Sequence, residues 1–362
     1  MKALSLVPGT KNVRIAEVTE PKVESSAEVK VRVLQVGICG TDREEVAGGR
    51  ADPPKGEKEL IIGHEMVGVV VEIGSGVKSL KPKDLVVIMV RRPCQICEPC
   101  KKGCSDMCAS GLYTERGIKG RHGFDTEFVV DEEIYMIKVP LGLQSIAVLT
   151  EPTTVVEKAI DHAGRLQVAR LPVQSDAKTW LQGKKVLVAG LGPIGLLASM
   201  VLRLRGAHVI GMDIVDPVSA RPKILEAMGG QYMQSAKMPR ESTFDLIVEA
   251  AGIPTLDFEL IDLLGINGVY VLTGVPGDDH PLNVDAGRLM RQLVLKNQIV
   301  FGSVNAGKEH FKQAVIDLEA AQKKWPGVVE RLITSKTPYQ QYNQVLLHRK
   351  PDEIKAVLEW SA

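Results

Sequence analysis

The feature that most constrains the fold is a cluster of cysteines, which holds five of the six in the chain. Cys94, Cys97, Cys100 and Cys108 follow one another on one short stretch with little apolar periodicity. Four thiolates on one loop can close a tetrahedron around Zn²⁺ and leave no open position, as in structural zinc sites. We therefore predict that residues 93–111 form a lobe held by a structural zinc, here called the cysteine lobe.

Cys104 lies inside the same lobe, but a zinc tetrahedron needs only four ligands. We leave Cys104 out of the predicted set, and Cys104 in place of Cys108 stays open as an alternative. Thiols this close together do not suit a disulfide framework for 362 residues, and in a reducing compartment clustered thiols more often bind metal. Residues 1–4 lack a signal-peptide pattern, and no stretch approaches the roughly 20 apolar residues of a membrane span. We expect a cytoplasmic protein.

A second metal site of a different kind is predicted upstream. Cys39 and His64 each follow a strand-like run and sit in glycine-bounded turns. One thiol and one imidazole cannot fill a tetrahedron, so a carboxylate and a water have room, as in catalytic zinc sites. Glu151 is the favoured third protein ligand, and Glu65, beside His64, offers a carboxylate at or near the metal. The alternative is a buried free thiol and a histidine satisfied by ordinary hydrogen bonds.

The first third of the chain is predicted to be rich in β-structure. Residues 29–33 alternate valine with basic residues, which favours a half-exposed strand that ends at Cys39. Residues 67–73 and 85–90 are further apolar runs bounded by turn residues, and a helix is expected over 152–163.

From residue 184 the pattern changes to alternating strands and helices. Strands are expected at 185–189, 207–212, 244–248 and 269–272, and helices at 193–205, 219–228 and 255–264. This alternation predicts a doubly wound parallel sheet, so the fold class is α/β.

The tail is predicted to return to the first domain. It has helical patterns at 309–323 and 352–359 and a strand-like run at 328–333. We therefore expect two domains, which also fits the length. A zinc-binding catalytic domain would comprise residues 1–181 and 306–362, and a coenzyme domain would comprise 182–305.

The coenzyme domain carries the pattern Gly-x-Gly-x-x-Gly between a strand and a helix. Gly190 and Gly192 let the backbone turn and approach a pyrophosphate at the helix N-terminus, and Gly195 lets helix and strand pack closely. The pattern predicts a dinucleotide-binding set of Gly190, Gly192, Pro193, Ile194, Gly195 and Asp213.

Asp213 follows Gly195 by 18 positions and ends the next strand. A carboxylate there accepts hydrogen bonds from the adenosine ribose hydroxyls and repels a 2′-phosphate. NAD is therefore favoured over NADP as the cofactor, although Arg221 on the following helix offers a cation to a phosphate.

The net charge of the chain is +1, from 45 Lys and Arg against 44 Asp and Glu. This balance gives no electrostatic reason to expect a nucleic acid or an anionic membrane as partner.

Over nearly its whole length the sequence resembles the zinc-dependent medium-chain dehydrogenase/reductase superfamily. The resemblance lies in Gly63-His64-Glu65-x2-Gly68-x5-Gly74-x2-Val77, in the cysteine lobe and in the dinucleotide pattern. Within the superfamily it is most similar to archaeal-type glucose (aldose) 1-dehydrogenases, through residues 37–44, 91–93, 113–118 and 302–305. The resemblance implies a GroES-like catalytic domain, a Rossmann coenzyme domain, two zinc ions per chain and a homodimer or homotetramer.

It also implies a reaction: hydride transfer from the anomeric hydroxyl of an aldose at the catalytic zinc to NAD(P), giving a lactone. Thr41 would relay the proton, and Glu65 would be a mobile ligand or would anchor the water. Glu115 and Asn305 would contact the sugar, together with Glu65 and Glu151, while His122 and Asp42 would lie at the edge of the site. Gly274 and Asn305 would complete the dinucleotide-binding set. The alternatives are a polyol or secondary-alcohol dehydrogenase, such as one acting on threonine, and a non-catalytic NAD(H)-binding protein.

Overall fold

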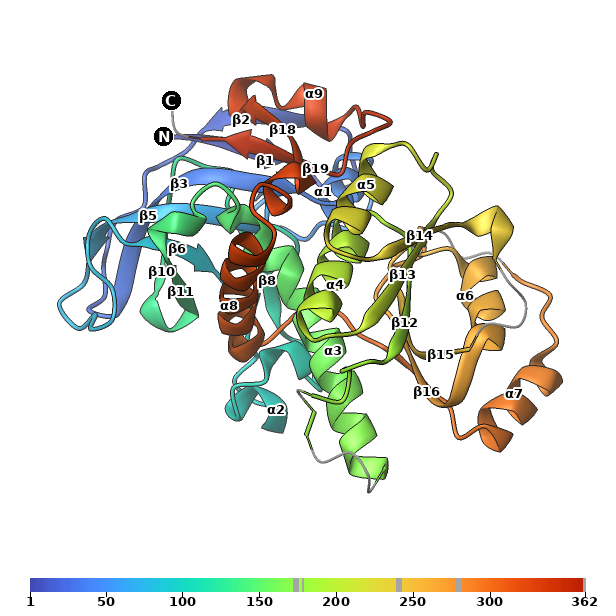
Figure 1. The fold of residues 1–362 in the computed structure, drawn as a ribbon. Coiled ribbons are helices and arrows are strands. Elements are labelled where there is room, and N and C mark those ends of the chain that lie inside the picture. The colour runs from blue at the N-terminus through green and yellow to red at the C-terminus, as the bar shows by residue number, and fades with distance from the viewer. Residues whose placement is uncertain (172–175, 178, 239–242, 278–280, 361–362) are drawn as a thin grey trace. The chain divides into compact units, whose positions relative to one another are not determined.

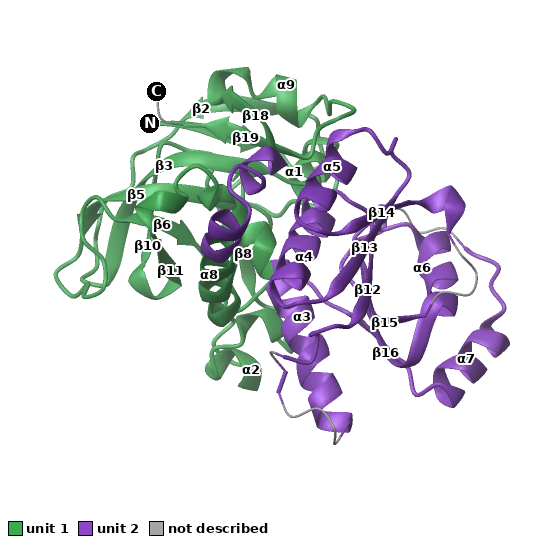
Figure 2. Ribbon diagram, viewed as in Figure 1, with its two compact units in different colours: residues 1–154, 305–318, 333–362 green, residues 155–304, 319–332 purple. Residues whose placement is uncertain are grey.

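The computed structural model describes residues 1–171, 176–177, 179–238, 243–277 and 281–360. The chain divides into two compact units, coloured in Figure 2. Unit 1 comprises Met1–Thr154, Asn305–Leu318 and Ile333–Ala362, and unit 2 comprises Val155–Val304 and Glu319–Leu332. Among the described residues, no helix combines the length and the apolar character that crossing a membrane requires.

Unit 1 is built on a sheet in which seven strands are described, in the order β11-β6-β5-β3-β19-β18, with β10 also pairing with β3. These strands are β3 (Glu28–Ile38), β5 (Glu65–Ile73), β6 (Leu85–Ile88), β10 (Phe128–Glu132), β11 (Met136–Val139), β18 (Ile333–Pro338) and β19 (Lys355–Glu359). β3 alternates as the sequence predicts: Val29, Val31 and Val33 are fully buried in the core, whereas Arg32 is exposed.

Two smaller sheets of unit 1 have the orders β2-β1-β4 and β7-β8-β9. Their strands are β1 (Lys2–Leu6), β2 (Val13–Glu17), β4 (Leu60–Ile61), β7 (Arg91–Arg92), β8 (Thr114–Arg116) and β9 (Gly120–Arg121). The short helices of this unit are α1 (Gly40–Val46), α2 (Glu98–Lys101) and α9 (Asn343–Leu346).

The prediction for the tail is wrong in two places. The helix expected over residues 352–359 is the strand β19, because Ala356, Val357 and Leu358 are all fully buried between β3 on one side and β18 on the other. The strand expected over 328–333 is the 3₁₀ turn Val329–Leu332, and β18 begins only at Ile333. The tail does return to the first sheet, as predicted.

Unit 2 contains a parallel sheet of six described strands in the order β14-β13-β12-β15-β16-β17. The strands are β12 (Lys185–Ala189), β13 (His208–Asp213), β14 (Gln231–Gln234), β15 (Phe244–Glu249), β16 (Leu264–Leu272) and β17 (Ile299–Gly302). The helices are α4 (Pro193–Leu204), α5 (Ala220–Ala227), α6 (Pro254–Leu260) and α7 (Ala286–Leu295). Figure 1 shows α4 running beside β12 and β13. The doubly wound sheet is confirmed, and its strand order reverses direction between β12 and β15.

Two long helices, α3 (Thr150–Arg170) and α8 (Lys308–Lys324), belong partly to each unit. The predicted boundary at residues 181/182 therefore differs from the observed division at 154/155. The difference has a local cause: Gln167 and Arg170, near the end of α3, donate hydrogen bonds to the Asn267 carbonyl of unit 2.

Candidate functional site

Cys39 and His64 lie at the same end of two paired strands. Cys39 directly follows β3, His64 directly precedes β5, and the strands are antiparallel with Gly37 opposite Glu65. The ligand atoms of Cys39, His64 and Glu65 all lie within 4.8 Å of one another. The close approach needs Gly37, because a Cβ there would stand 2.2 Å from Glu65 Oε2. The three side chains form what is here called the sheet-end centre.

The imidazole of His64 is oriented by Asp42. His64 Nδ1 stands 3.2 Å from Asp42 Oδ1, and Asp42 also accepts a hydrogen bond from the Cys39 amide at 2.7 Å through Oδ2. Asp42 is fully buried, so its carboxylate interacts strongly with both the His64 imidazole and the Cys39 amide. With Nδ1 facing a carboxylate, Nε2 is the nitrogen left for a metal. The sequence marks Asp42 only as an edge residue, but it holds the turn and the ring together.

Glu65 forms a buried ion pair with Lys355, a partner that the sequence does not reveal. Lys355 Nζ lies 2.6 and 2.8 Å from the two Glu65 oxygens and also donates to the Ile38 carbonyl at 3.1 Å. Glu65 is 1% exposed and Lys355 2%. Burial opposes the charge on Lys355, but the Glu65 carboxylate outweighs it and the pKa of Lys355 is raised. The pair fixes the Glu65 carboxylate beside Cys39 and His64.

Glu151 lies in the first turn of α3 and outside the 4.8 Å group. Burial raises the pKa of its carboxyl to about 7, with His64 opposing the rise and the Glu65 carboxylate adding to it. Glu151 therefore interacts electrostatically with the sheet-end centre, while Glu65 is the carboxylate that the structure groups with the thiol and the imidazole.

Two further buried acids surround the centre. Glu45 on α1 is fully buried, and burial together with the Asp42 charge raises its pKa to about 9. Asp125 accepts a hydrogen bond from Trp360 Nε1 at 2.9 Å, and burial and Asp42 raise its pKa to about 8. Both carboxyl groups therefore hold a proton at neutral pH, and a cation bound at the centre would favour their charged forms.

The cysteine lobe brings together the four predicted sulfurs. The Sγ atoms of Cys94, Cys97, Cys100 and Cys108 lie within 4.8 Å of one another. The Cys94–Cys97 and Cys97–Cys108 sulfur separations are 3.4 and 3.8 Å, and a zinc tetrahedron with bonds of ~2.3 Å requires about 3.8 Å. The Cys97–Cys108 separation equals this value, and the Cys94–Cys97 separation is 0.4 Å shorter. Cys104 lies outside this group, with its sulfur near the Lys102 carbonyl.

Glu115 and Asn305 are joined directly. Asn305 Nδ2 donates to Glu115 Oε1 at 2.7 Å, and Arg91 donates to the same oxygen through Nε and Nη2 at 3.1 and 2.9 Å. Asn305 adopts a left-handed backbone conformation with φ of 59°, which asparagine tolerates better than most residues. The role of Arg91 is absent from the sequence-based predictions. His122 pairs with Glu57 at 2.8 Å instead. It belongs neither to the sheet-end centre nor to the set formed by Glu115, Asn305 and Arg91.

The glycine-rich turn of unit 2 has the predicted geometry. It runs from β12 to α4, with Gly192 as the helix N-cap. A Cβ on Gly195 would stand 1.7 Å from the Gly190 carbonyl oxygen, so only glycine fits there. Asp213 ends β13, and its Oδ2 accepts from the Leu191 amide at 2.8 Å and lies 3.4 Å from Arg221 Nη1. Both the carboxylate and the guanidinium therefore stand beside this turn.

Glu249, at the end of β15, is a further residue that the sequence does not single out. Its fully buried carboxylate accepts hydrogen bonds from the amides of Ala251, Gly252 and Gly274, at 2.5, 2.6 and 3.2 Å. These bonds place Gly274 at the carboxyl ends of the sheet strands, beside the turn between β12 and α4. The sequence signal was weak, because Glu249 lies in an ordinary strand.

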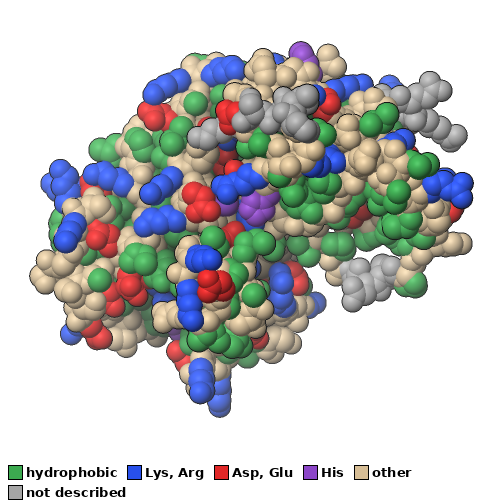
Figure 3. All heavy atoms as spheres, turned by 90° about the horizontal axis from the view of Figure 1, so that it is seen from below, with side chains coloured by type: hydrophobic (Ala, Val, Ile, Leu, Met, Phe, Trp, Pro, Cys, Tyr) green, Lys and Arg blue, Asp and Glu red, His purple; other side chains and the backbone are tan. Residues whose placement is uncertain are grey.

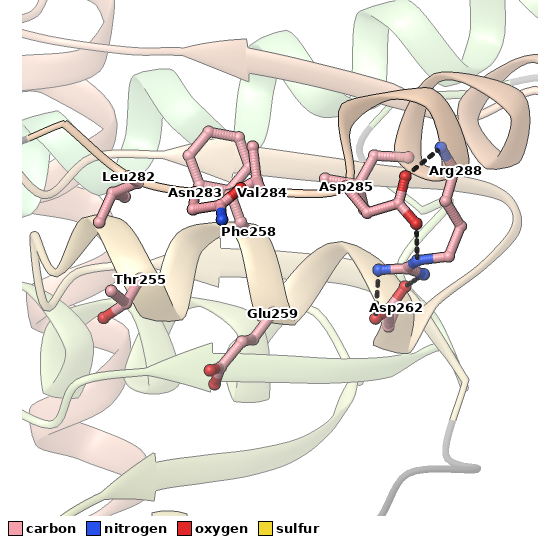
Figure 4. Close-up of a pocket in the computed structure, with 10 residues that line it drawn as sticks. Thr255, Phe258, Glu259, Asp262, Leu282, Asn283, Val284, Asp285 and Arg288 are labelled. Carbon is pink, nitrogen blue, oxygen red and sulfur yellow. Dashed lines mark hydrogen bonds and ion pairs between the residues drawn. The ribbon is translucent and has the colours of Figure 1, made fainter.

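Figure 4 shows a separate pocket of about 200 Å³ in unit 2, where α6 faces residues 282–289. Its Arg288 side chain already donates to Asp262 at 2.6 Å, and the Arg288 backbone amide donates to Asp285 Oδ1 at 3.0 Å. None of the predicted site residues lines this pocket. On the surface drawn in Figure 3, basic and acidic side chains are interspersed, in keeping with the near-zero net charge.

Known proteins match the chain over its full length. Residues 25–141 match the family model of the alcohol dehydrogenase GroES-like domain, and residues 144–360 match that of the glucose dehydrogenase C-terminus. Glucose 1-dehydrogenase 2 of Vulcanisaeta moutnovskia and glucose 1-dehydrogenase of Thermoproteus tenax are each 39% identical, with 99% of each chain covered.

A solved structure agrees with these matches. The Haloferax mediterranei glucose dehydrogenase, in complex with NADP, Zn and gluconolactone, has a TM-score of 0.88 and 33% identity, with 100% of both chains covered. Galactitol-1-phosphate dehydrogenase from Escherichia coli, at 24% identity and a TM-score of 0.79, shows the same fold. The chain therefore belongs to the glucose dehydrogenase family of zinc-dependent medium-chain dehydrogenases.

Proposed function

We propose that the protein is a zinc-dependent NAD(P) aldose 1-dehydrogenase that oxidises the anomeric hydroxyl of a sugar such as glucose to a lactone. The observation that carries the proposal is the sheet-end centre: one thiol, one imidazole and one carboxylate within 4.8 Å, in a chain that matches glucose 1-dehydrogenases end to end. A mixed donor set with three members leaves a fourth position for substrate, unlike the all-cysteine lobe.

Cys39 and His64 would hold the catalytic zinc, with Glu65 or Glu151 as the third protein ligand. The zinc would stabilise negative charge on the hydroxyl oxygen of the sugar. In the balanced reaction the sugar carbon loses a hydride to the nicotinamide cofactor, and the hydroxyl proton passes to solvent. Thr41, two residues after Cys39, is assigned to relay that proton, and Asp42 keeps the His64 ring in place.

The other proposed roles divide between unit 1 and unit 2. Unit 1 would be the catalytic domain, in which Glu115 and Asn305 bind sugar hydroxyls and Cys94, Cys97, Cys100 and Cys108 hold a second, structural zinc. Unit 2 would be the coenzyme domain, with the dinucleotide on Gly190, Gly192, Pro193, Ile194, Gly195, Asp213 and Gly274; Asn305 would reach the nicotinamide. The free thiols favour a reducing, cytoplasmic compartment.

The family resemblance favours a homodimer or homotetramer. In the described part of unit 2, β17 pairs only with β16, so its other edge is open to a second copy. Met290, Val294 and Leu295 on the preceding α7 expose apolar side chains. Light scattering of the purified protein measures the oligomeric state, and a monomer at micromolar concentration would reject this assignment.

The test of the function is a steady-state screen of C5 and C6 aldoses and of polyols with NAD and NADP. Aldoses should give NAD(P)H with a lactone as product. Turnover of polyols or secondary alcohols to ketones, without turnover of aldoses, would replace the proposal with a polyol dehydrogenase. If the protein holds two zinc ions per chain but turns over none of these substrates, the alternative of a non-catalytic NAD(H)-binding protein would replace the proposal.

The cofactor preference tests the role of Asp213. Its carboxylate should favour NAD over NADP by about 10–150-fold in kcat/KM, which corresponds to about 1.4–3 kcal/mol. Asp213→Asn should weaken the use of NAD and narrow that gap. A wild type that already prefers NADP would show that Arg221, whose Nη1 lies 3.4 Å from Asp213 Oδ2, determines the cofactor preference in place of Asp213.

A further inference from the structure

Arg91 and Arg92 form the two-residue strand β7, and they point to different partners. Arg91 lies opposite Glu115 on β8 and forms its ion pair with that residue. Arg92 instead pairs with Asp131, which also binds Arg116. Both arginines are nearly fully buried, at 6% and 4% exposure. A buried guanidinium is costly unless its charge is paired and hydrogen-bonded, and each arginine meets this need through a different carboxylate.

The guanidinium of Arg91 links two parts of unit 1. Nε and Nη2 donate to Glu115 Oε1, while Nη1 donates to the Asp106 carbonyl at 3.1 Å. Asp106 belongs to the 3₁₀ turn Ser105–Met107, which lies between Cys100 and Cys108 in the cysteine lobe. The guanidinium also stacks on the Tyr113 ring, 3.8 Å from its centroid. Arg91 is therefore fixed in position and cannot follow Glu115 if that side chain rotates.

Among the described residues, the hydrogen bonds to the Glu115 carboxylate all end on one oxygen. Oε1 receives Nε and Nη2 of Arg91 and Nδ2 of Asn305, the last at 2.7 Å. In the described part of the chain no hydrogen bond ends on Oε2. An ionised carboxylate can accept about four hydrogen bonds over its two oxygens, so Oε2 keeps its full accepting capacity.

We propose that Arg91 is a positioning residue for the sugar: it ties Glu115 to the backbone of the cysteine lobe, so that Oε2 is presented to a sugar hydroxyl. The inference rests on the proposed function, in which Glu115 contacts the substrate. A lysine at position 91 cannot replace the arginine, because its single ammonium lacks the planar fork that binds Glu115 and the Asp106 carbonyl together.

The test compares glucose with its monodeoxy analogues, using the intact zinc-loaded enzyme. In the wild type, removal of the hydroxyl that Oε2 binds should lower kcat/KM by about 10–100-fold, the range for a hydrogen bond to a charged group. Glu115→Gln should reduce this penalty to a few-fold. Arg91→Lys should reduce it in the same way and raise KM for glucose, with kcat and the cofactor KM nearly unchanged.

Arg92→Lys is the matched control, because it makes the same change on the same strand at a residue bound to Asp131. In Arg92→Lys, removal of the same sugar hydroxyl should lower kcat/KM as much as in the wild type. If Arg91→Lys does not fold, Tyr113→Leu removes the ring that contacts both the Arg91 guanidinium and the Lys119 ammonium, and it should reduce the penalty about two- to fivefold.

The outcomes separate the two proposals. If no aldose is turned over, the proposed function fails. If a deoxy-sugar penalty depends on Glu115 but stays the same in the folded position-91 or position-113 variant, the positioning role of Arg91 is wrong and the function stands. If aldoses are oxidised but no penalty depends on Glu115, Glu115 does not contact the sugar and the positioning role falls with it.

Discussion

The cysteine lobe and the sheet-end centre both gather metal-ligating side chains in unit 1, but their surroundings differ. The lobe has four sulfurs on short, partly exposed elements, and Ile96, Met107 and Leu112 around them are more than half exposed. The centre has one sulfur, one imidazole and several buried carboxyl groups at the end of the main sheet, with Ile38, Ile62 and Met66 almost completely buried beside it.

This contrast shows which part of the protein determines the geometry of the lobe and which determines that of the centre. Among the described residues, the lobe buries few apolar side chains, so a bound metal would have to supply most of its folding free energy. The sheet-end centre is positioned by strands that fold for other reasons, so it would keep its shape and leave a coordination position for chemistry. Removing a ligand should therefore cost stability in the lobe and activity in the centre.

The largest expected effect is on activity at the centre. His64→Ala should lower kcat/KM by at least about a thousandfold, because loss of the ligand removes several kcal/mol of charge stabilisation. Cofactor binding, measured by fluorescence titration, should be close to normal. His208→Ala, at an exposed position in unit 2, is the control. Near wild-type turnover in His64→Ala would mean that the centre is assigned to the wrong residues.

The counterpart in the lobe is Cys97→Ser. It should lower the free energy of unfolding by on the order of 5 kcal/mol, because metal binding there is coupled to folding. Thermal unfolding and zinc content measure the effect, and the folded fraction should keep its kcat. Cys104→Ser, outside the sulfur group, should change neither quantity. If stability and zinc content are unchanged in Cys97→Ser, the claim that the lobe, unlike the centre, depends on a metal for its stability is wrong.

A third prediction concerns the Glu65–Lys355 pair. Lys355→Met leaves the Glu65 carboxylate buried without its counter-charge and should destabilise the metal-free protein by about 3 kcal/mol. Adding Glu65→Gln should recover most of the loss, as measured by denaturant unfolding. If the single variant is as stable as the wild type, the pair does not hold the centre together.

The smallest effect, for any one pH unit, is a pH dependence from Glu45. Its pKa in the folded state is raised to about 9, so the folded protein holds a proton that the unfolded chain loses above its ordinary pKa of 4.5. Stability should therefore fall as the pH rises from 4.5 towards 9, by up to about 1.4 kcal/mol per pH unit. Glu45→Gln should flatten this fall, whereas Glu44→Gln, at the exposed neighbour, should not. Equal slopes in wild type and Glu45→Gln would show that Glu45 ionises normally.

The sequence predicted what depends on local patterns. β12 and α4 start where expected because their apolar periodicity and the glycine-rich turn are local signals. The stretch 352–359 was predicted as a helix because its burial on both sides comes from β3 and β18, neither of which the local pattern reveals.

The candidate site follows the same rule. Cys39 and His64 stand out through the glycines that flank them. Lys355 does not, because its partner Glu65 is 290 positions away in the chain. For Arg91 the sequence offers only a family pattern, since its contacts with Asp106 and Glu115 depend on the pairing of β7 with β8.

The separation of Glu65 from Lys355 also has a consequence during protein synthesis. A ribosome adding about 5–20 residues per second needs about 15–60 s to extend the chain from one residue to the other. Throughout that interval β5 has no lysine to neutralise its first residue. We therefore expect the nascent first sheet to keep Glu65 hydrated, and the metal centre to be completed only after β19 has joined β3.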